Sequence, residues 1–153
     1  MTIVARYDAA TGRYSAFEDT STELGYAERT TVDTTTSTSY ASAPSNKISG
    51  LSVTVVGEGL AVSVEFFCPG VKHSTAGVGV ASALVLNGAL TGGQIGLGDS
   101  DSTANSRTLI MRRRMILTAG TSYTFEVGKY VMSAGTGTYD AAADFPMHLS
   151  VSR

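Results

Sequence analysis

The chain has 153 residues, a formal net charge of −2 and one cysteine. This composition excludes a disulfide-stapled module and a strongly basic nucleic-acid binder, and no apolar run reaches the length of about 18 residues that a membrane-spanning helix needs. Seventeen glycines and seven tyrosines, with only 16% charged residues, favour a domain of short strands and tight turns.

The N-terminal part of the chain differs in character from the rest. Residues 1–28 carry scattered hydrophobic side chains without a sustained period, and residues 30–45 include ten serines or threonines. Such a tract is typical of a polar linker or of an extended, Thr-rich strand. We therefore predict a docking arm at residues 1–33 and a β-sandwich domain at residues 34–153, with its first strand around Thr34–Tyr40.

From Ile48 onward, hydrophobic residues recur at every second position, which is the period of a β-strand. Two alternating runs flank the turn Gly57–Gly59 and predict a hairpin. Further runs follow at 78–86, 109–117, 123–131 and 145–151, and no segment has a helical period. Seven or eight regularly spaced strands predict an all-β fold, an antiparallel β-sandwich or jelly roll.

The same alternation selects one hydrophobic face on each strand. Because a shift of one residue would expose the whole face, the pattern also predicts which side chains form the core. The predicted core comprises Leu51, Val53, Val62, Val64, Leu84, Leu109, Phe125, Leu149 and Val151.

No motif of enzyme chemistry is found. The chain has no GxSxG nucleophile motif, no phosphate-binding glycine loop and no CxxC pair. His73, His148 and Cys68 are the only nitrogen and sulfur ligands for zinc, and their spacing matches no zinc motif, so both histidines are expected at the solvated surface. Cys68 ends an apolar run and is predicted to be a buried, unreactive thiol. We expect neither an enzyme nor a cofactor.

One acidic loop needs a test for calcium. Asp99, Asp101 and Asn105 place oxygen ligands at alternate positions, as at the start of an EF-hand. Position six of that pattern would be Ala104 and position twelve Ile110, where an EF-hand needs glycine and glutamate. The EF-hand is excluded, and a looser metal site or a plain polar loop stays open.

Arg112, Arg113 and Arg114 form the sharpest charge feature. On a strand, Arg112 and Arg114 point to one side and Arg113 to the other, between Met111 and Met115. Arg113 is expected to pair with a carboxylate such as Glu65 or Glu126, at an edge or a subunit contact. Alternatively, Arg112 and Arg114 form a patch for an anionic partner.

Two stretches of the chain resemble a known family. TTTSTSYASAPSNKISGLSVTVVGEGLAVSVEFFC and LTAGTSYTFEVGKYVMSAGTGTYDAAADFPMHLSVSR are similar to the C-terminal β-sandwich modules of minor tail proteins and fibres in tailed bacteriophages. Those modules in turn resemble the trimeric jelly roll of the tumour necrosis factor and complement globular-head superfamily. The matching elements are Thr34–Pro44, Gly50–Val55, Leu60–Phe67, Leu117–Phe125, Gly135–Thr138 and Met147–Val151.

The resemblance implies a homotrimer located in the virion. We separately expect the N-terminal arm, residues 1–33, to dock it to other virion proteins, because the arm has aromatic residues without a core pattern of its own. A tail or fibre component and a capsid decoration or head-fibre protein are both compatible with the resemblance. A second class of function is a receptor- or glycan-binding jelly roll that uses the loops 70–76, 96–106 and 133–144. The resemblance supplies no catalytic residues, and no nucleic-acid or membrane partner is expected.

Two predicted strands are apolar on both sides. Ile110 and Ile116 lie opposite Met111 and Met115, and Tyr130 and Met132 lie opposite Val127 and Val131. A two-layer sandwich covers only one side of each strand. A subunit contact would cover the other side, as a trimer held by the β domain requires.

Overall fold

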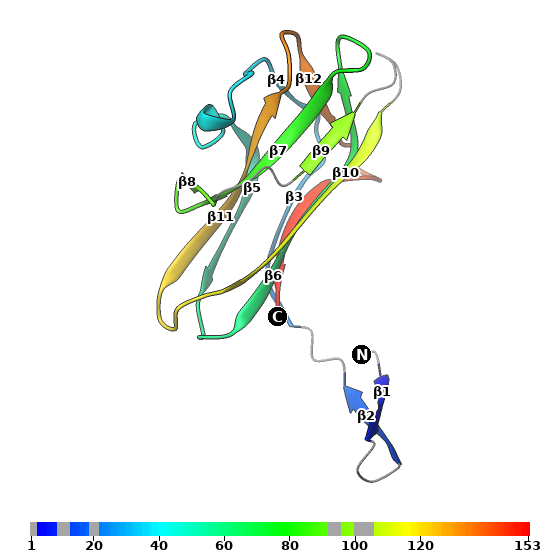
Figure 1. Ribbon diagram of the computed structural model, residues 1–153, viewed down its shortest axis with the longest axis vertical. Helices are drawn as coiled ribbons and strands as arrows, with labels where there is room; N and C mark the ends of the chain where they lie inside the picture. The colour runs from blue at the N-terminus through cyan, green and yellow to red at the C-terminus, as the bar shows by residue number, and fades with distance from the viewer. Residues whose placement is uncertain (1–2, 9–12, 19–21, 92–95, 100–105) are drawn as a thin grey trace.

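The computed structural model describes residues 3–8, 13–18, 22–91, 96–99 and 106–153. In these ranges the chain forms β-strands and one short 3₁₀ helix, η1 (Tyr40–Ser42) (Figure 1). The strands are β1 (Ile3–Asp8), β2 (Arg13–Glu18), β3 (Glu23–Arg29), β4 (Asp33–Thr35), β5 (Lys47–Val56), β6 (Ala61–His73), β7 (Gly79–Leu86), β8 (Ala89–Leu90), β9 (Gly96–Asp99), β10 (Arg107–Ile116), β11 (Ser122–Val131), β12 (Gly137–Asp140) and β13 (Met147–Ser152).

The first sheet is built around the long strand β6. On one side β6 pairs with β10, and on the other side it pairs with β13 and then with β12. Strand β3 continues the sheet beyond β13, and β4 continues it beyond β12. The pairs β12–β13 and β3–β4 therefore each act as one interrupted strand, with β10 and β3–β4 at the two edges.

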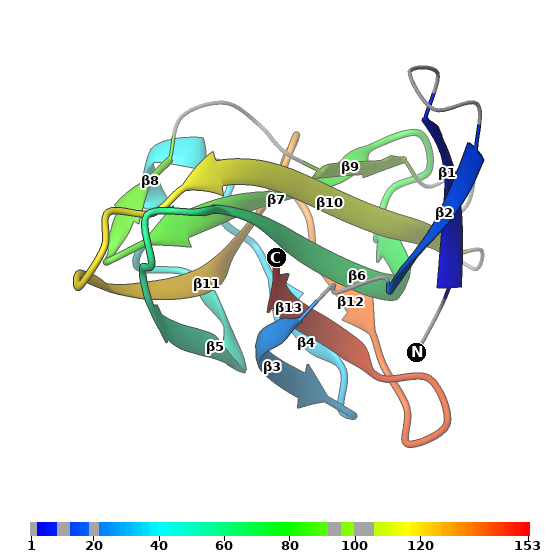
Figure 2. The same cartoon turned by 90° about the horizontal axis from the view of Figure 1, so that it is seen from below.

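The second sheet has the order β5-β11-β7, followed by β8 and β9, which both pair with β7. The strands of the two sheets can be numbered from β3 onward, with β3–β4, β8–β9 and β12–β13 each counted as one strand. The first sheet then has the order 1-8-3-6 and the second 2-7-4-5, all antiparallel. This strand order is that of a jelly roll. The two layers wrap around each other in Figure 2, and the predicted all-β sandwich is confirmed.

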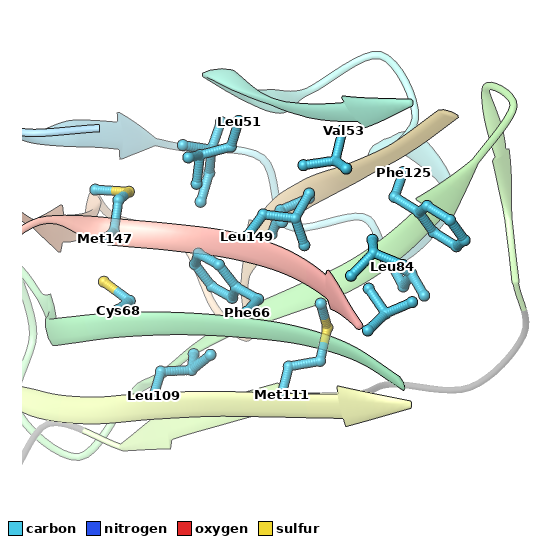
Figure 3. Packing of buried hydrophobic residues seen from close by; sticks show 14 of the residues in the cluster. Leu51, Val53, Phe66, Cys68, Leu84, Leu109, Met111, Phe125, Met147 and Leu149 are labelled. Carbon is cyan, nitrogen blue, oxygen red and sulfur yellow. The ribbon is translucent and has the colours of Figure 1, made fainter. Parts of the chain in front are cut away.

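The hydrophobic core lies between the two sheets (Figure 3). All nine side chains predicted as core are buried, each with at most 4% of its surface exposed. Phe66, Met111 and Met147 belong to the same cluster, on β6, β10 and β13. The alternation of period 2 therefore identified the inward face of the main strands correctly.

The N-terminal boundary of the sandwich differs from the prediction. Strand β3 lies inside the segment expected as a docking arm, yet it pairs with β13 from Met147–Arg29 to Ser152–Glu23. The strand expected around Thr34–Tyr40 is reduced to Asp33–Thr35, after which the chain turns into η1. A docking role for the N-terminal segment stays a prediction, and it now concerns residues before Glu23.

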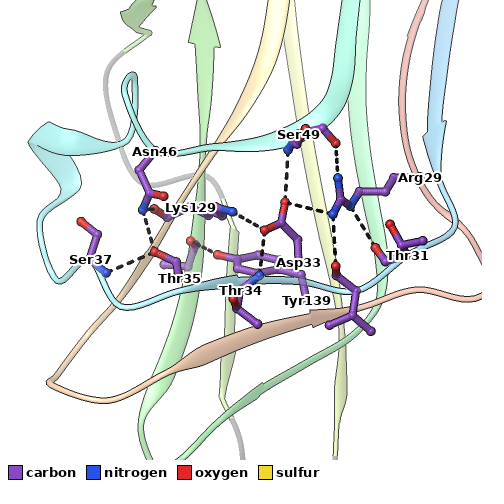
Figure 4. A network of polar contacts seen from close by, with 12 residues as sticks. Arg29, Thr31, Asp33, Thr34, Thr35, Ser37, Asn46, Ser49, Lys129 and Tyr139 are labelled. Atoms are coloured by element: carbon purple, nitrogen blue, oxygen red, sulfur yellow. Dashed lines mark hydrogen bonds and ion pairs between the residues drawn. The ribbon is translucent and has the colours of Figure 1, made fainter.

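A buried ion pair joins the two sheets (Figure 4). The Lys129 ammonium on β11 contacts the Asp33 carboxylate on β4, and both side chains are about one-tenth exposed. The backbone N–H groups of Thr34 and Ser49 donate to the same carboxylate, at 2.7 and 3.1 Å. Burial alone would raise the pKa of Asp33, but the hydrogen bonds from Lys129, Ser49 and Thr34 and the Lys129 charge hold it below its usual value. The carboxylate is thus ionised and fully partnered.

The chain covers the outer face of its own second sheet. Residues 36–46, which include η1, lie across β11 and β7, where Ala43 and Tyr130 are buried against Ala81 and Ala83. The Tyr40 and Tyr130 rings meet edge to face at 5.7 Å. The apolar outer side of β11 at Tyr130, expected to need a neighbouring subunit, is therefore covered within the same chain.

Candidate interaction surface

The outer face of the first sheet has no such cover in the described part of the chain. Its residues form three rows across β10, β6, β13 and β3, fixed by the strand register. We name each row by its residue on β10. The rows are Ile110–Phe67–His148–Glu28, Arg112–Glu65–Ser150–Tyr26 and Arg114–Ser63–Ser152–Glu23, with a bulge in β13–β3 pairing beside the last.

Apolar groups are exposed on this outer face. Ile110 is 53% exposed and Ile116, at the end of β10, is 75% exposed. The two isoleucines lie six residues apart on the strand, with the outward Arg112 and Arg114 between them, so they are two separate apolar groups and not one continuous patch. Strand β10 therefore keeps the uncovered apolar side that its sequence predicted, and Met132, just after β11, is 53% exposed as well.

An aromatic ladder crosses the middle of the outer face. The His148 ring stacks between Phe67 at 5.2 Å and Tyr26 at 5.6 Å, these being the distances between ring centroids. His148 was expected at the solvated surface, and this stacking leaves it half-buried. The ladder gives the face a rigid apolar centre, because rings held by neighbours on both sides have few rotamers to lose on binding.

The three arginines take different environments. Arg112 and Arg114 point outward and Arg113 is turned to the other side, as the alternation predicted. Glu65 pairs with Arg112 instead of Arg113, and Glu126 pairs with Lys47 at 2.7 Å. Arg113 donates to the Thr91 hydroxyl at 2.9 Å. Neither carboxylate named from the sequence is thus the partner of Arg113.

Arg114 is an exposed charge on the outer face. Within the part of the chain that the structure describes, it forms no hydrogen bond or ion pair. It borders an open hollow of about 500 Å³ lined by Thr22, Leu60, Ala61, Arg114 and Arg153. A guanidinium in this position can pair with a carboxylate presented by another molecule.

The remaining candidates from the sequence do not join this surface. His73, expected in solvent, is buried, and its Nδ1 accepts the N–H of Thr75 at 3.0 Å. Asp101 and Asn105 lie outside the described residues, as does the side chain of Asp99, so the calcium hypothesis stays open. Among the described residues, no three His, Cys, Asp or Glu side chains gather where they could hold a metal ion.

A hollow of about 380 Å³ lies on the second sheet beside the covering segment 36–46. Thr38, Tyr40, Tyr130 and Met132 line it. Its two tyrosine rings and its hydroxyl groups offer both stacking surfaces and hydrogen-bonding groups to a small molecule. The sequence did not predict this hollow, because its residues come from segments 90 positions apart.

Cys68 is fully buried, and its thiol donates to the Gly70 carbonyl at 3.2 Å. Burial raises the pKa of the Cys68 thiol to about 12, so almost no thiolate exists at neutral pH. We expect a thiol-specific reagent to label the folded protein at least 100-fold more slowly than the unfolded protein, as measured by mass spectrometry against time. Equal rates in the two states would contradict this assignment.

Comparisons with models of protein families and with curated proteins give no match for this chain. In the described residues, no helix is long and apolar enough to span a bilayer. The case for a function therefore depends on the surface itself and on the sequence resemblance.

Proposed function

We propose that the protein is a structural subunit of a tailed-bacteriophage virion, a tail or fibre component that forms a homotrimer through the outer face of its first sheet. The observation that carries the proposal is the pair of exposed isoleucines, Ile110 and Ile116, beside Arg112 and Arg114 on β10. Segment 36–46 covers the outer face of the second sheet around Tyr130, although Val56 and Met132 stay exposed, whereas no segment of the described chain lies over the outer face of the first sheet.

Self-association accounts for this surface in physical terms. Burying Ile110, Ile116 and the aromatic ladder against another copy removes apolar area from water and so favours association. A closed ring uses every such contact once and ends, whereas an open contact would continue into a filament. The trimeric form of the ring is what the resemblance to phage modules implies.

The location in a virion has support from the sequence alone. The resemblance spans roughly residues 30–153, and jelly rolls are frequent among viral structural proteins, although a fold by itself does not fix a function. A capsid decoration or head-fibre role is equally compatible with the surface. Electron cryo-microscopy of the parent particle would distinguish these places and would show what the segment before Glu23 contacts.

The oligomer is tested by light scattering. We expect a mass about three times the 15.8 kDa of the chain, and we expect Ile116→Asp to give monomers, because a carboxylate cannot be buried there without a partner. Val56→Asp is the matched control, since Val56 is 60% exposed but lies on β5, in the second sheet. A chain beginning at Thr22 tests the N-terminal segment without removing β3.

A monomeric full-length chain would contradict the proposed oligomer, and a dimer would contradict the trimer. If the chain beginning at Thr22 is monomeric, the contact belongs to the N-terminal segment and not to the outer face. If it stays trimeric but no longer enters particles, the docking role of that segment is supported.

A receptor- or glycan-binding role is the second candidate, favoured by the hollow at Tyr40 and Tyr130. Aromatic rings stack on the apolar faces of sugars, while hydroxyl groups hydrogen-bond to the ring substituents. Saturable binding of a host-surface glycan, weakened by a substitution at Met132, would favour this role over a purely structural one.

A further inference from the structure

We infer that neighbouring subunits meet with β10 of one copy against β3 of the next, about a rotation axis parallel to the strands, so that Arg114 faces Glu23. This inference rests on the proposed self-association and names the contact that produces it. It is independent of how many copies close the ring.

The outer face is electrically polar from one edge to the other. Its β10 edge carries Arg112 and Arg114, and its β3 edge carries Glu23 and Glu28. Glu65 on β6 neutralises Arg112 in part, whereas Arg114 has no partner in the described chain. The β10 edge thus carries excess positive charge and the β3 edge carries two glutamates, while Arg153, which lies beside Thr22, is paired with Glu58. The face therefore complements a second copy of itself.

The direction of the rotation axis follows from this polarity. A twofold axis perpendicular to the sheet places the β10 edges of two copies side by side, or their β3 edges. A twofold axis that lies in the plane of the sheet and runs perpendicular to the strands stacks β10 of one copy on β10 of the other. Both arrangements bring like charges together, which is costly at an interface. Only an axis along the strands places the arginine edge of one copy against the glutamate edge of the next.

The strand register then fixes which residues meet. A rotation about an axis along the strands leaves the height of each residue unchanged, so each row meets the same row of the neighbour. In the Arg114 row, the residue on β3 is Glu23, and in the Arg112 row it is Tyr26. The first pair is a salt bridge and the second places a guanidinium near an aromatic ring.

The same register sets what the other rows meet. In the Ile110 row the residue on β3 is Glu28, so Ile110 faces Glu28 of the neighbouring copy, and Phe67 and His148 lie between the two edges. Ile116 lies beyond the last row that has a paired residue on β3, next to the hollow at Arg114. Charge pairing would thus set the register of the contact, and burial of the aromatic rings between the copies would add apolar area to it.

The test is a charge exchange within one chain. Arg114→Glu and Glu23→Arg should each raise the dissociation constant of the oligomer about 10-fold or more, because each places like charges face to face. The double variant restores an opposite-charge pair at every contact and should return the constant to within about threefold of the original. Asp144→Arg, in the exposed loop 141–146, is the matched control and should change nothing.

A second measurement does not depend on affinity. In the double variant Arg114→Cys, Glu23→Cys, mild oxidation should link neighbouring chains into covalent oligomers, while Arg114→Cys alone and Glu23→Cys alone should stay unlinked. The buried Cys68 should not interfere. Linking of the double variant together with rescue by the charge exchange would support the inference.

The outcomes separate the inference from the proposed function. Suppose that the protein associates but the dissociation constant of the double charge variant rises by the product of the two single effects. In that case the proposed contact is wrong and self-association stands. If the unmodified protein is monomeric at all concentrations, both fail.

Discussion

Replacing Asp33 by asparagine is expected to lower the free energy of unfolding by about 3–5 kcal/mol, the usual cost of breaking a buried ion pair by removing one partner. The side chain of Lys129 is only 8% exposed, and in Asp33→Asn its ammonium would stay charged without a carboxylate. Asparagine keeps the size of aspartate, but the N–H groups of Thr34 and Ser49 donate to different carboxylate oxygens, and the single side-chain oxygen of asparagine can accept only one of them. The loss therefore measures the uncompensated charge together with one lost backbone hydrogen bond, and not a cavity.

Two further variants separate charge from packing. Adding Lys129→Met to Asp33→Asn should recover much of the lost stability, because no buried charge is then left over. Glu126→Gln breaks the more exposed pair with Lys47 and should cost at most about 1 kcal/mol. Urea unfolding followed by circular dichroism gives all three values. A loss below about 1 kcal/mol in Asp33→Asn would show that the pair does not hold the sheets together.

The same pair makes a prediction about acid. Because the pKa of Asp33 is lower in the folded chain, its contribution is complete above the unfolded-state pKa of about 3.9. That contribution is lost as the pH falls from there through the folded-state pKa. The unmodified protein should therefore lose more stability than Asp33→Asn between about pH 5 and pH 2. Parallel pH curves for the two proteins would contradict this assignment.

The sequence predicted the strands that carry large inward side chains. On β5 and β6 these are Leu51, Val53, Val62 and Val64, and their alternation with polar residues leaves one possible core face. Strand β3 lacks this signal because its inward side carries small residues. A Cβ on Gly25 would lie 2.4 Å from Cγ1 of Val53, so the packing of β3 on β5 requires a glycine there. A strand that packs through glycine and alanine shows no alternation of large hydrophobic residues, so its position cannot be predicted from the sequence pattern.

The polar features needed the three-dimensional topology. Asp33 and Lys129 are 96 positions apart, and nothing in either local sequence marks the pair. The outward direction of Arg112 and Arg114 followed from alternation alone. The acidic edge did not, because Glu23 and Glu28 join the same face only when β3 pairs with β13. The candidate surface was therefore half predictable, namely the half that lies on β10.

Truncation of the two adjacent phenylalanines of β6 should affect different properties of the protein. Phe66 is fully buried between its cross-strand neighbours Met111 and Leu149 (Figure 3), whereas Phe67 faces outward and stacks on His148. Phe66→Ala leaves a cavity in the core and should lower the free energy of unfolding by about 3–5 kcal/mol. Phe67→Ala removes a group from the outer face and leaves the core intact.

The two variants are best distinguished by how their thermal stability depends on protein concentration. An oligomer stabilises its folded subunits more as the concentration rises, so a change at the contact alters this dependence, while a change in the core shifts stability equally at all concentrations. Thermal unfolding at several dilutions measures both. We expect Phe66→Ala to lower every melting temperature by a similar amount and Phe67→Ala to act mainly at high concentration, where the oligomer forms. If Phe67→Ala instead destabilises the diluted chain as much as Phe66→Ala does, the outer face serves the fold of the single subunit, and the case for a contact between copies loses its aromatic component.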